Sequence, residues 1–419
     1  MINKDLALFC YPWDVIDEGY DAIINAVKRS GLNSIYITVN YHSGMFFLPH
    51  SIKRKIYFPE PGALYFNPNN WHKKHSFQSP ISNLTNNWSL FWEELSNKCK
   101  QNNIKLCAWM LGTHNSGIGN NYPEMSVHNA WGDPITHSLC PFNSEVVDHF
   151  VNLSRDIVNL GVFDKILIES LEYLPLRHDH HHEVIGVDFS ADLDFIMSLN
   201  FSKKCLEALK QKNVDGEMIK NWVKETTNDY FNKNIKKEIM NWSDFENAID
   251  GQFWKYYQIR EESITNINKV VINELRQDKN LKIGLVDFGP LYPLGPNKQR
   301  WQNGVNLTSL LPLIDEIHPT FYFADLELFK QKYDIYKNVL KNKVDMIPAI
   351  RTILPQIANQ TDLNNQLKVF NQESAGFSFY NYSFMNYENL DWIKYCVFVI
   401  MSRSYRVLST CPCSGKGDH

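Results

Sequence analysis

Acidic residues stand at the ends of two apolar runs of the sequence. Glu169 follows residues 166–168, and Asp287 follows residues 284–286. If both runs are neighbouring parallel strands, they end on one side of the sheet and the two carboxyl groups face one site. Burial there would raise the pKa of a carboxyl group, as a general acid requires. Such a pair suits cleavage of a glycosidic bond, in which one carboxyl group protonates the leaving oxygen and the other attacks the carbon or activates water.

Further polar and aromatic residues stand at or just after the ends of other apolar runs. Those predicted to orient sugar hydroxyl groups are Tyr41, His42, His114, Asn115 and His318. Two rings that could stack on sugar faces are Tyr322 and Tyr380. The second choices for the same pocket are Glu172, Asp133, His181 and Glu183, with Glu172 as the other candidate for the second catalytic carboxylate.

The seventh apolar run ends in Arg351 and Thr352, where many retaining barrel glycosidases place an acid. Arg351 is therefore assigned to substrate binding. In the competing interpretation, Arg351 or another base forms a salt bridge with the acids, which then have only a structural role.

The densest chemical motif is Arg-His-Asp-His-His-His-Glu at residues 177–183. Imidazoles and carboxylates at this density can bind zinc or another transition metal. Adjacent side chains diverge, however, and the spacing is not that of a helical His-Glu-x-x-His site. Sugar recognition, a solvated loop and metal binding all stay open, and we predict neither a metal nor a cofactor. A glycine-rich phosphate loop is also absent from the sequence.

Apolar runs typical of strands alternate with stripes typical of helices along the whole chain. The predicted strands cover residues 6–13, 34–40, 105–111, 165–169, 282–287, 316–323, 346–351 and 376–380. Helix caps are predicted at Asp17, Asp325 and Thr361, and Gly161 is predicted to end a helix. About eight strands in continuous alternation with helices favour a closed (β/α)8 barrel of the TIM type over an open sheet.

Two long excursions interrupt the alternation after strands two and four, at about residues 41–88 and 170–241. Both follow the carboxyl end of a strand, which is the face that carries the active site in such barrels. We therefore expect one barrel domain over residues 1–410, with both insertions over the active-site face and a polar tail at residues 411–419.

Composition limits the classes of partner. The chain has 42 Lys and Arg against 46 Asp and Glu, a formal net charge of −4, so no overall positive field favours nucleic acid. No run approaches 18 apolar residues, and the N-terminus lacks the pattern of a signal peptide. We predict a soluble, cytoplasmic protein whose partner is neither nucleic acid nor a membrane.

Several segments, taken in order, resemble bacterial barrel proteins that are grouped with the glycoside hydrolases. The segments are residues 40–42, 48–50, 57–66, 114–116, 129–133 and 138–141, followed by Glu169 and residues 181–183. The resemblance spans most of the chain and implies a TIM-type barrel that acts on a carbohydrate, without fixing the substrate or the catalytic pair.

Together these observations favour a glycoside hydrolase with Glu169 as acid/base and Asp287 as its partner. Two alternatives stay open. One is a metal-dependent hydrolase or isomerase of a sugar derivative that uses the His-rich motif. The other is a non-catalytic carbohydrate-binding barrel, which the missing acid of the seventh strand would fit.

Overall fold

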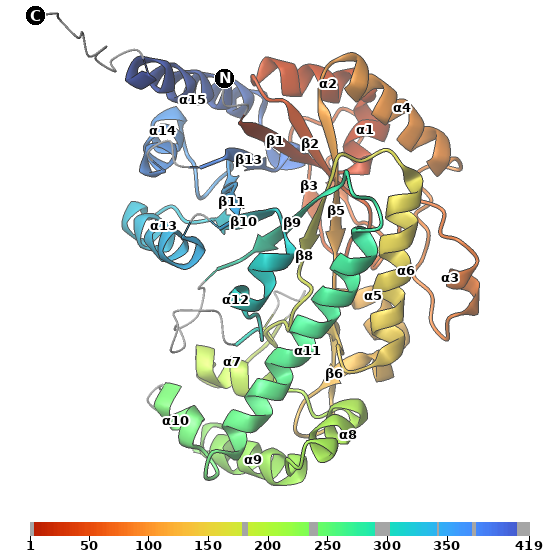
Figure 1. Ribbon diagram of the computed structural model, residues 1–419, viewed down its shortest axis with the longest axis vertical. Coiled ribbons are helices and arrows are strands. Elements are labelled where there is room, and N and C mark those ends of the chain that lie inside the picture. Colours follow the sequence, from red (N-terminus) through yellow and green to blue (C-terminus); the bar gives the residue numbers. More distant parts are fainter. Residues whose placement is uncertain are drawn as a thin grey trace, which may run out of the picture.

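Eight parallel strand positions form a closed barrel in the structure (Figure 1). Each position is called a stave, because one of them is shared by two short strands. The computed structural model describes residues 4–177, 183–233, 242–289, 302–341, 343–370 and 374–408. The staves are β1 (Asp5–Cys10), β2 (Ser34–Thr38), β5 (Lys105–Leu111), β8 (Lys165–Glu169), β9 (Lys282–Asp287), β10 (Glu316–Phe321), β11 (Asp345–Met346) with β12 (Ala349–Arg351), and β13 (Gly376–Tyr380). Pairing of β1 with β13 and of β9 with β10 closes the ring, which confirms the predicted (β/α)8 fold.

Helices connect successive staves and cover the outside of the barrel. They are α2 (Tyr20–Arg29), α4 (Trp88–Gln101), α6 (Ser144–Leu160), α11 (Gln252–Leu275), α12 (Leu307–Leu310) with η2 (Leu311–Leu313), α13 (Leu326–Leu340), α14 (Gln360–Val369) and α15 (Tyr387–Leu408). In α6 the residues Val146, Phe150, Leu153 and Ile157 are buried, as the spacing of one helical face requires. Among the described helices, none has the length and apolar character needed to cross a membrane.

The helix boundaries confirm two of the predicted signals. The Asp325 side chain accepts hydrogen bonds from the first turn of α13, and Gly161 ends α6 with a left-handed φ of 63°. The caps predicted at Asp17 and Thr361 are wrong. Asp17 lies inside α1 (Pro12–Glu18) and forms ion pairs with Lys53 and Arg54, and Asn359 caps α14 one residue before its first residue.

Additional elements follow several of the staves. After β2 come β3 (Phe46–Phe47), β4 (Ile56–Tyr57) and α3 (Trp71–Lys74); after β5 come α5 (Ser116–Asn121), η1 (Pro123–Met125), β6 (Ser126–His128) and β7 (Pro134–Leu139); after β8 come α7 (Ala191–Met197), α8 (Lys203–Gln211), α9 (Gly216–Asn232) and α10 (Trp242–Asn247). A short turn, η3 (Tyr382–Phe384), follows β13. The elements after β5 had no counterpart among the predicted insertions.

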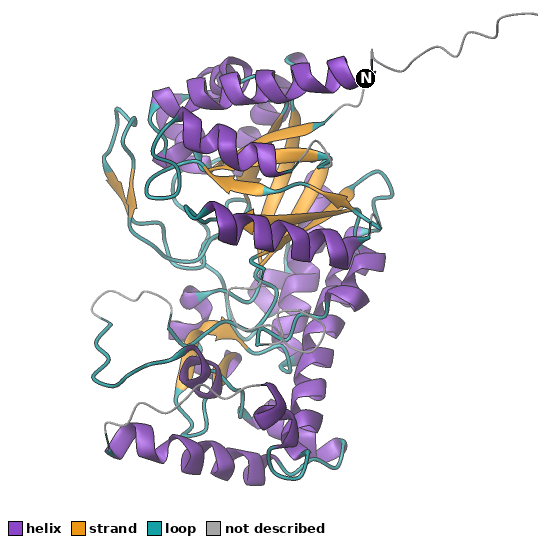
Figure 2. Cartoon of the chain, turned by 90° about the vertical axis from the view of Figure 1, so that its left-hand side faces the viewer, coloured by secondary structure: helices purple, strands orange, loops and turns teal. Residues whose placement is uncertain are grey.

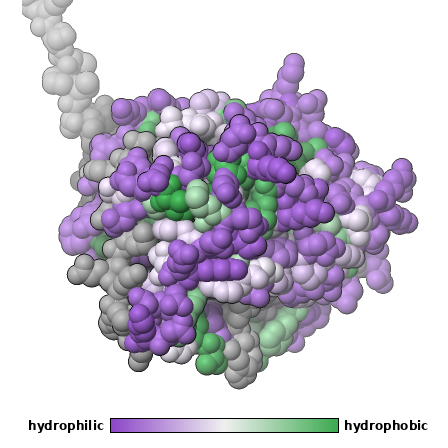
Figure 3. Space-filling view, turned by 90° about the horizontal axis from the view of Figure 1, so that it is seen from below, coloured by the Kyte–Doolittle hydropathy of each residue, from purple (hydrophilic) through white to green (hydrophobic). Residues whose placement is uncertain are grey.

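The elements after β8 form a helical lobe at the carboxyl ends of the staves (Figure 2). This lobe has its own apolar core, in which Phe195, Leu209 and Phe253 are buried. Helix α11 joins the two cores, because its first half packs in the lobe and its second half, from Ile264, packs on the barrel. Seen from the lobe side, the surface is mostly hydrophilic with smaller hydrophobic patches (Figure 3). The long helix therefore connects the lobe directly to the barrel.

Candidate active site

The carboxyl ends of the staves surround a cavity of about 320 Å³. Its described walls come from segments that follow β2, β5, β8, β9 and β10 and from the end of β13. Several residues that were predicted from the sequence line it together, namely Tyr41, His42, His114, Glu169, Glu172, Tyr322 and Tyr380. Their position is the one in which barrel enzymes carry their active sites.

Glu169 faces this cavity from the last position of β8. Side chains alternate across a strand, and Lys165, Leu167 and Glu169 all point into the barrel. The indole Nε1 of Trp109 donates a hydrogen bond to Glu169 Oε2 at 2.8 Å. Burial raises the pKa of Glu169 to about 8; the Trp109 hydrogen bond opposes this, and the charge of Glu172 adds to it. Glu169 is therefore mostly protonated at neutral pH, as a general acid must be.

Glu172 enters the same cavity after a turn in the chain. Ser170 makes this turn with a left-handed φ of 54°. The Thr113 hydroxyl accepts a hydrogen bond from the backbone N–H of Glu172 at 3.1 Å and donates to the Ser170 carbonyl oxygen at 2.7 Å. The amide of Asn303 donates to Glu172 Oε1 at 3.0 Å. Glu172 is thus held at both its backbone and its carboxyl group.

Tyrosine and histidine rings form another wall. The Tyr11 hydroxyl oxygen lies 3.0 Å from the hydroxyl oxygens of both Tyr41 and Tyr380. Burial raises the pKa of all three phenols, so they stay neutral and can exchange hydrogen bonds with sugar hydroxyls. The rings of His42 and His114 stack with their centroids 3.8 Å apart and their planes 18° from parallel. These groups give the cavity flat apolar faces edged by hydrogen-bonding atoms.

Asp287 lies outside this cavity, which corrects the predicted pairing with Glu169. Gly284 of the same strand lies against His318 inside the barrel, so Asp287, three positions later, points outward. Asp287 is 2% exposed, and its carboxyl group accepts a hydrogen bond from the hydroxyl of Tyr336 on α13. The side chain of the next residue, Phe288, points to the inside of the barrel and lines the cavity.

His318 also lies elsewhere, in a buried charged network near the amino ends of the staves. Its Nε2 is 3.2 Å from Glu316 Oε2, and Lys165 contacts both Glu316 and Asp5. Burial would raise the pKa values of Asp5 and Glu316, but Lys165, together with His318 beside Glu316, holds both below their ordinary values. Burial lowers the pKa of His318. These groups stabilise the barrel interior and do not line the cavity.

The remaining predicted site residues have other positions. Asn115 caps α5 by accepting from the Ile118 N–H at 2.9 Å, and Asp133 accepts from the Asn129 amide in the turn between β6 and β7. Neither side chain lines the cavity.

Two charged residues of the prediction are not part of the described cavity lining. Arg351 packs its guanidinium 5.9 Å from the ring centroid of Tyr322, and its Nε has no hydrogen-bond partner in the described part of the chain. Glu183 forms an exposed ion pair with Arg177 at 3.1 Å. His181 lies outside the described residues, together with most of the His-rich motif. Where the structure is described, no three His, Cys, Asp or Glu side chains are grouped for metal binding.

Sequence reasoning missed several residues that line the cavity, namely Ser170, Leu174, Pro175, Phe288 and Asn303. Phe288 could have been found from the alternation of side chains along a strand. It follows Asp287 directly, so its side chain points to the opposite face. Asn303 stands in a loop with no periodic pattern. Its role depends on a contact with Glu172 across 131 positions of the chain, which no local signal indicates.

Comparison with known proteins identifies the fold. No protein-family model and no curated protein sequence matches the chain. The solved β-galactosidase of the psychrophilic Marinomonas ef1 is similar over 97% of this chain, with a TM-score of 0.56 and 8% identity. The chain spans about 60% of the length of that enzyme. At this identity the similarity shows the (β/α)8 fold alone.

Two further solved structures align with most of this chain. They are a GH20 catalytic module of the pneumococcal exo-β-D-N-acetylglucosaminidase StrH (TM-score 0.47, 7% identity, 94% of this chain and 84% of that one) and a GH113 β-1,4-mannanase (TM-score 0.43, 8% identity, 93% and 97%). All three similar structures are glycoside hydrolases with the TIM-barrel fold.

Proposed function

We propose that the protein is a glycoside hydrolase in which Glu169 is the general acid and Glu172 is the second carboxylate. The observation that carries this proposal is a buried carboxyl group facing a cavity walled by tyrosine and histidine rings, where burial raises its pKa to about 8. A neutral acid at this position can protonate the oxygen of a departing sugar. The glycosidase folds of the similar structures are consistent with this reaction.

Glu172 replaces Asp287 as the partner because both glutamates line one cavity and interact electrostatically. As Glu169 protonates the leaving oxygen, Glu172 attacks the anomeric carbon or activates a water molecule. A carboxyl separation of roughly 5 Å in a substrate complex would indicate retention of configuration, and roughly 6.5 to 9.5 Å would indicate inversion. The Tyr41 and Tyr380 hydroxyls would orient the sugar during either reaction.

The test is turnover of a panel of aryl glycosides, beginning with β-galactosides because of the similar β-galactosidase fold. We expect Glu169→Gln to lower kcat by about 10²- to 10⁴-fold, the usual contribution of a general acid. Glu172→Gln should also remove most activity. The matched control is Glu207→Gln, because Glu207 lies on α8 in an exposed pair with Lys204.

Undiminished turnover by the Glu169 variant would remove this residue from the mechanism. A second function, carbohydrate binding without cleavage, is favoured by Arg351 and Thr352 at the end of stave seven, where no acid stands. It predicts saturable sugar binding by the wild-type protein with no product even after long incubation.

A further inference from the structure

Tyr11 is a buried residue whose hydroxyl group reaches two tyrosines of the cavity wall. It directly follows β1, is 0% exposed, and is not among the described residues that line the cavity. Its ring stacks on Trp13, with centroids 4.0 Å apart and planes 16° from parallel. Its backbone N–H donates to Asp14 Oδ2 at 2.8 Å. Because ring and backbone are both held, the Tyr11 hydroxyl oxygen stays in one place.

The hydrogen bonds of this hydroxyl group have a defined direction. Its oxygen lies 3.0 Å from the hydroxyl oxygens of both Tyr41 and Tyr380. The geometry makes Tyr11 the donor toward Tyr41, whereas the contact with Tyr380 allows either donor. Burial raises the pKa of Tyr11, so the phenol is neutral and carries one hydrogen. Since that hydrogen is used toward Tyr41, the hydrogen between Tyr11 and Tyr380 comes from Tyr380.

This direction decides what each tyrosine offers to a ligand. Tyr380 gives its only hydrogen to Tyr11, so toward the cavity its oxygen acts as an acceptor. Tyr41 accepts from Tyr11 and keeps its own hydrogen for donation. Without a sugar nearby, this hydrogen can point toward Tyr380, whose hydroxyl group also affects the pKa of Tyr41. Tyr41 and Tyr380, the tyrosine pair, thus present one donor and one acceptor whose roles Tyr11 fixes.

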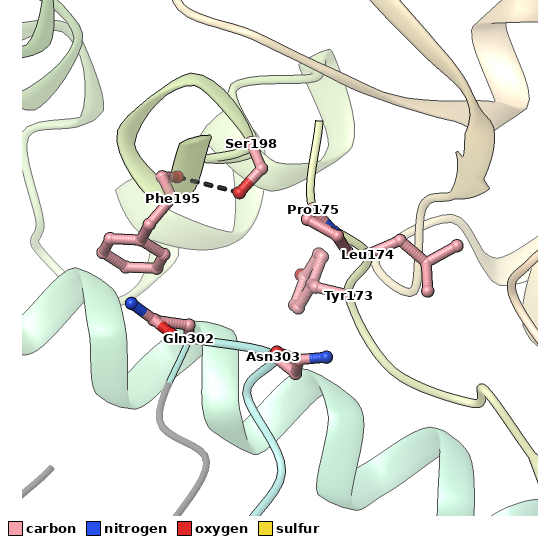
Figure 4. A pocket seen from close by; sticks show the side chains of 7 residues that line it. All are labelled: Tyr173, Leu174, Pro175, Phe195, Ser198, Gln302 and Asn303. Carbon is pink, nitrogen blue, oxygen red and sulfur yellow. Dashed lines mark hydrogen bonds between the residues drawn. The ribbon is translucent and has the colours of Figure 1, made fainter. Parts of the chain in front are cut away.

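The size of the neighbouring space shows where a sugar can meet the tyrosine pair. Asn303 lines the cavity of Glu169 and also a second space, which it shares with Tyr173, Phe195 and Gln302 (Figure 4). The second space has a volume of about 10 Å³, room for roughly one water molecule, so no sugar ring fits there. Of the two spaces, only the larger one, of about 320 Å³, can hold a ring against the tyrosine pair.

We propose that Tyr11 is a positioning residue that selects sugars with a free hydroxyl group opposite Tyr380. The inference rests on the proposed glycosidase function and narrows its substrate class. The selected sugar donates one hydroxyl hydrogen to Tyr380, and another of its oxygens accepts from Tyr41. A sugar with fluorine in place of the first hydroxyl group cannot donate. It leaves the Tyr380 oxygen without a hydrogen, which weakens binding.

The direction of the hydrogen bonds can be measured without a substrate. Neutron diffraction from crystals of the deuterated protein locates the deuterium atoms of hydroxyl groups. We expect the Tyr11 deuterium to point at Tyr41 and the Tyr380 deuterium to point at Tyr11. A Tyr11 deuterium that points at Tyr380 would overturn the proposal, whether or not the protein cleaves glycosides. Failure of the proposed function is a separate result, namely no turnover of any glycoside in the panel.

Binding measurements test the selection itself. The probes are p-nitrophenyl β-galactoside, or the panel glycoside that is cleaved fastest, and its singly fluorinated deoxy derivatives. They are titrated calorimetrically into Glu169→Gln, which binds without turnover. We expect one hydroxyl position at which fluorine weakens binding about tenfold. Adding Tyr11→Phe should abolish this discrimination, because Tyr380 regains a hydrogen that it can donate to fluorine. Equal discrimination with and without Tyr11→Phe would refute the role of Tyr11.

Further variants separate this role from a structural one. Tyr256→Phe is the matched control, because Tyr256 is a buried phenol of the helical lobe that donates to the Asn200 carbonyl oxygen at 3.1 Å. It should keep the full discrimination. Tyr380→Phe removes the acceptor and should lose the discrimination, and Tyr11→Phe should then have no additional effect on it. If Tyr11→Phe does not fold, full discrimination by Tyr380→Phe would by itself refute the proposal.

Discussion

The charge of Glu169 is set by its immediate surroundings. The carboxyl group is enclosed by protein on all sides except the cavity, and burial penalises its ionised form. Trp109 supplies a hydrogen bond that favours ionisation, while the nearby Glu172 disfavours it. The balance raises the pKa to about 8, so this residue is prepared to donate a proton. The same balance makes the residue a source of instability at alkaline pH.

This instability gives a prediction that needs no substrate. The folded-state pKa of about 8 lies above the ordinary value of 4.5, so the folded protein holds the proton more tightly than the unfolded chain. Wild-type stability is therefore lost as the pH rises from about 4.5 to about 8. Glu169→Gln stays neutral and avoids this loss. We expect the variant to gain on the order of 1 kcal/mol or more over the wild type between pH 5 and pH 9.

Urea unfolding at pH 5, 7 and 9 measures this gain. Glu207→Gln is again the control, because its exposed position should give a difference from the wild type that changes little with pH. A constant difference between the Glu169 variant and the wild type over this range would mean that Glu169 is already ionised in the folded protein.

At the level of elements, a buried ion pair attaches the hairpin of β3 and β4 to the barrel. His50, in the turn of the hairpin, has Nε2 3.1 Å from Glu18 Oε1 of α1, and its Nδ1 lies 2.7 Å from the carbonyl oxygen of Met385. Burial alone would lower the pKa of His50, but Glu18 raises it above its ordinary value. Tyr382 donates to the other oxygen of Glu18 at 2.7 Å. The attachment of the hairpin is thus strongest when His50 is protonated.

We expect this attachment to weaken as the pH rises. A histidine with a raised pKa stabilises the fold fully below its ordinary value of 6.5, and this contribution is lost as the pH passes the folded-state pKa. Asp14, whose pKa burial raises to about 7, ionises nearby in the same range. Hydrogen exchange of residues 46–57, corrected for the intrinsic pH dependence, should therefore show faster opening at pH 8.5 than at pH 6. His50→Gln should remove the difference, and an unchanged difference would contradict the role of His50.

The elements also explain which features could be predicted from the sequence. Most staves carry a run of apolar residues, and these runs alternate along the chain with helical patterns, so the strands were predictable from the sequence. The sequence does not show which side chains of a strand point into the barrel and which point toward the helices. Parallel strands are covered on both faces, so polar and apolar residues need not alternate along them. Asp287 and Glu169 therefore look equivalent in the sequence, although one points toward α13 and the other toward the cavity. Asn303 and Thr113, which hold Glu172, depend on long-range contacts without a local pattern.

At the scale of the whole molecule, the two ends of the barrel have different properties. The carboxyl ends of the staves hold carboxyl groups whose charge is disfavoured, next to a cavity. The amino ends hold ionised carboxylates that surround the buried Lys165 side chain. Breaking a buried ion pair leaves an uncompensated charge, so the network at the amino ends constrains stability more than any exposed pair. The helical lobe covers only the end that carries the cavity.

Two lysines of this network allow a matched test of that contrast. Lys165 has a side chain 2% exposed between Asp5 and Glu316, whereas the Lys282 side chain is 53% exposed and reaches the same Glu316 at 3.2 Å. We expect Lys165→Met to lose about 3–5 kcal/mol of unfolding free energy at pH 7. Lys282→Met should lose less than about 1 kcal/mol.

The loss in the Lys165 variant should also depend on pH in a defined direction. In the wild type, the lowered pKa values of Asp5 and Glu316 give stability that is present above their ordinary values and lost in acid. Without Lys165, Asp5 loses the charge that lowers its pKa most, so burial raises the pKa of this carboxyl group and the variant is destabilised as the pH rises. Chemical unfolding should therefore show a smaller difference between variant and wild type at pH 3.5 than at pH 7. Equal losses for the two lysine variants, or a difference independent of pH, would show that the buried network does not supply this stability.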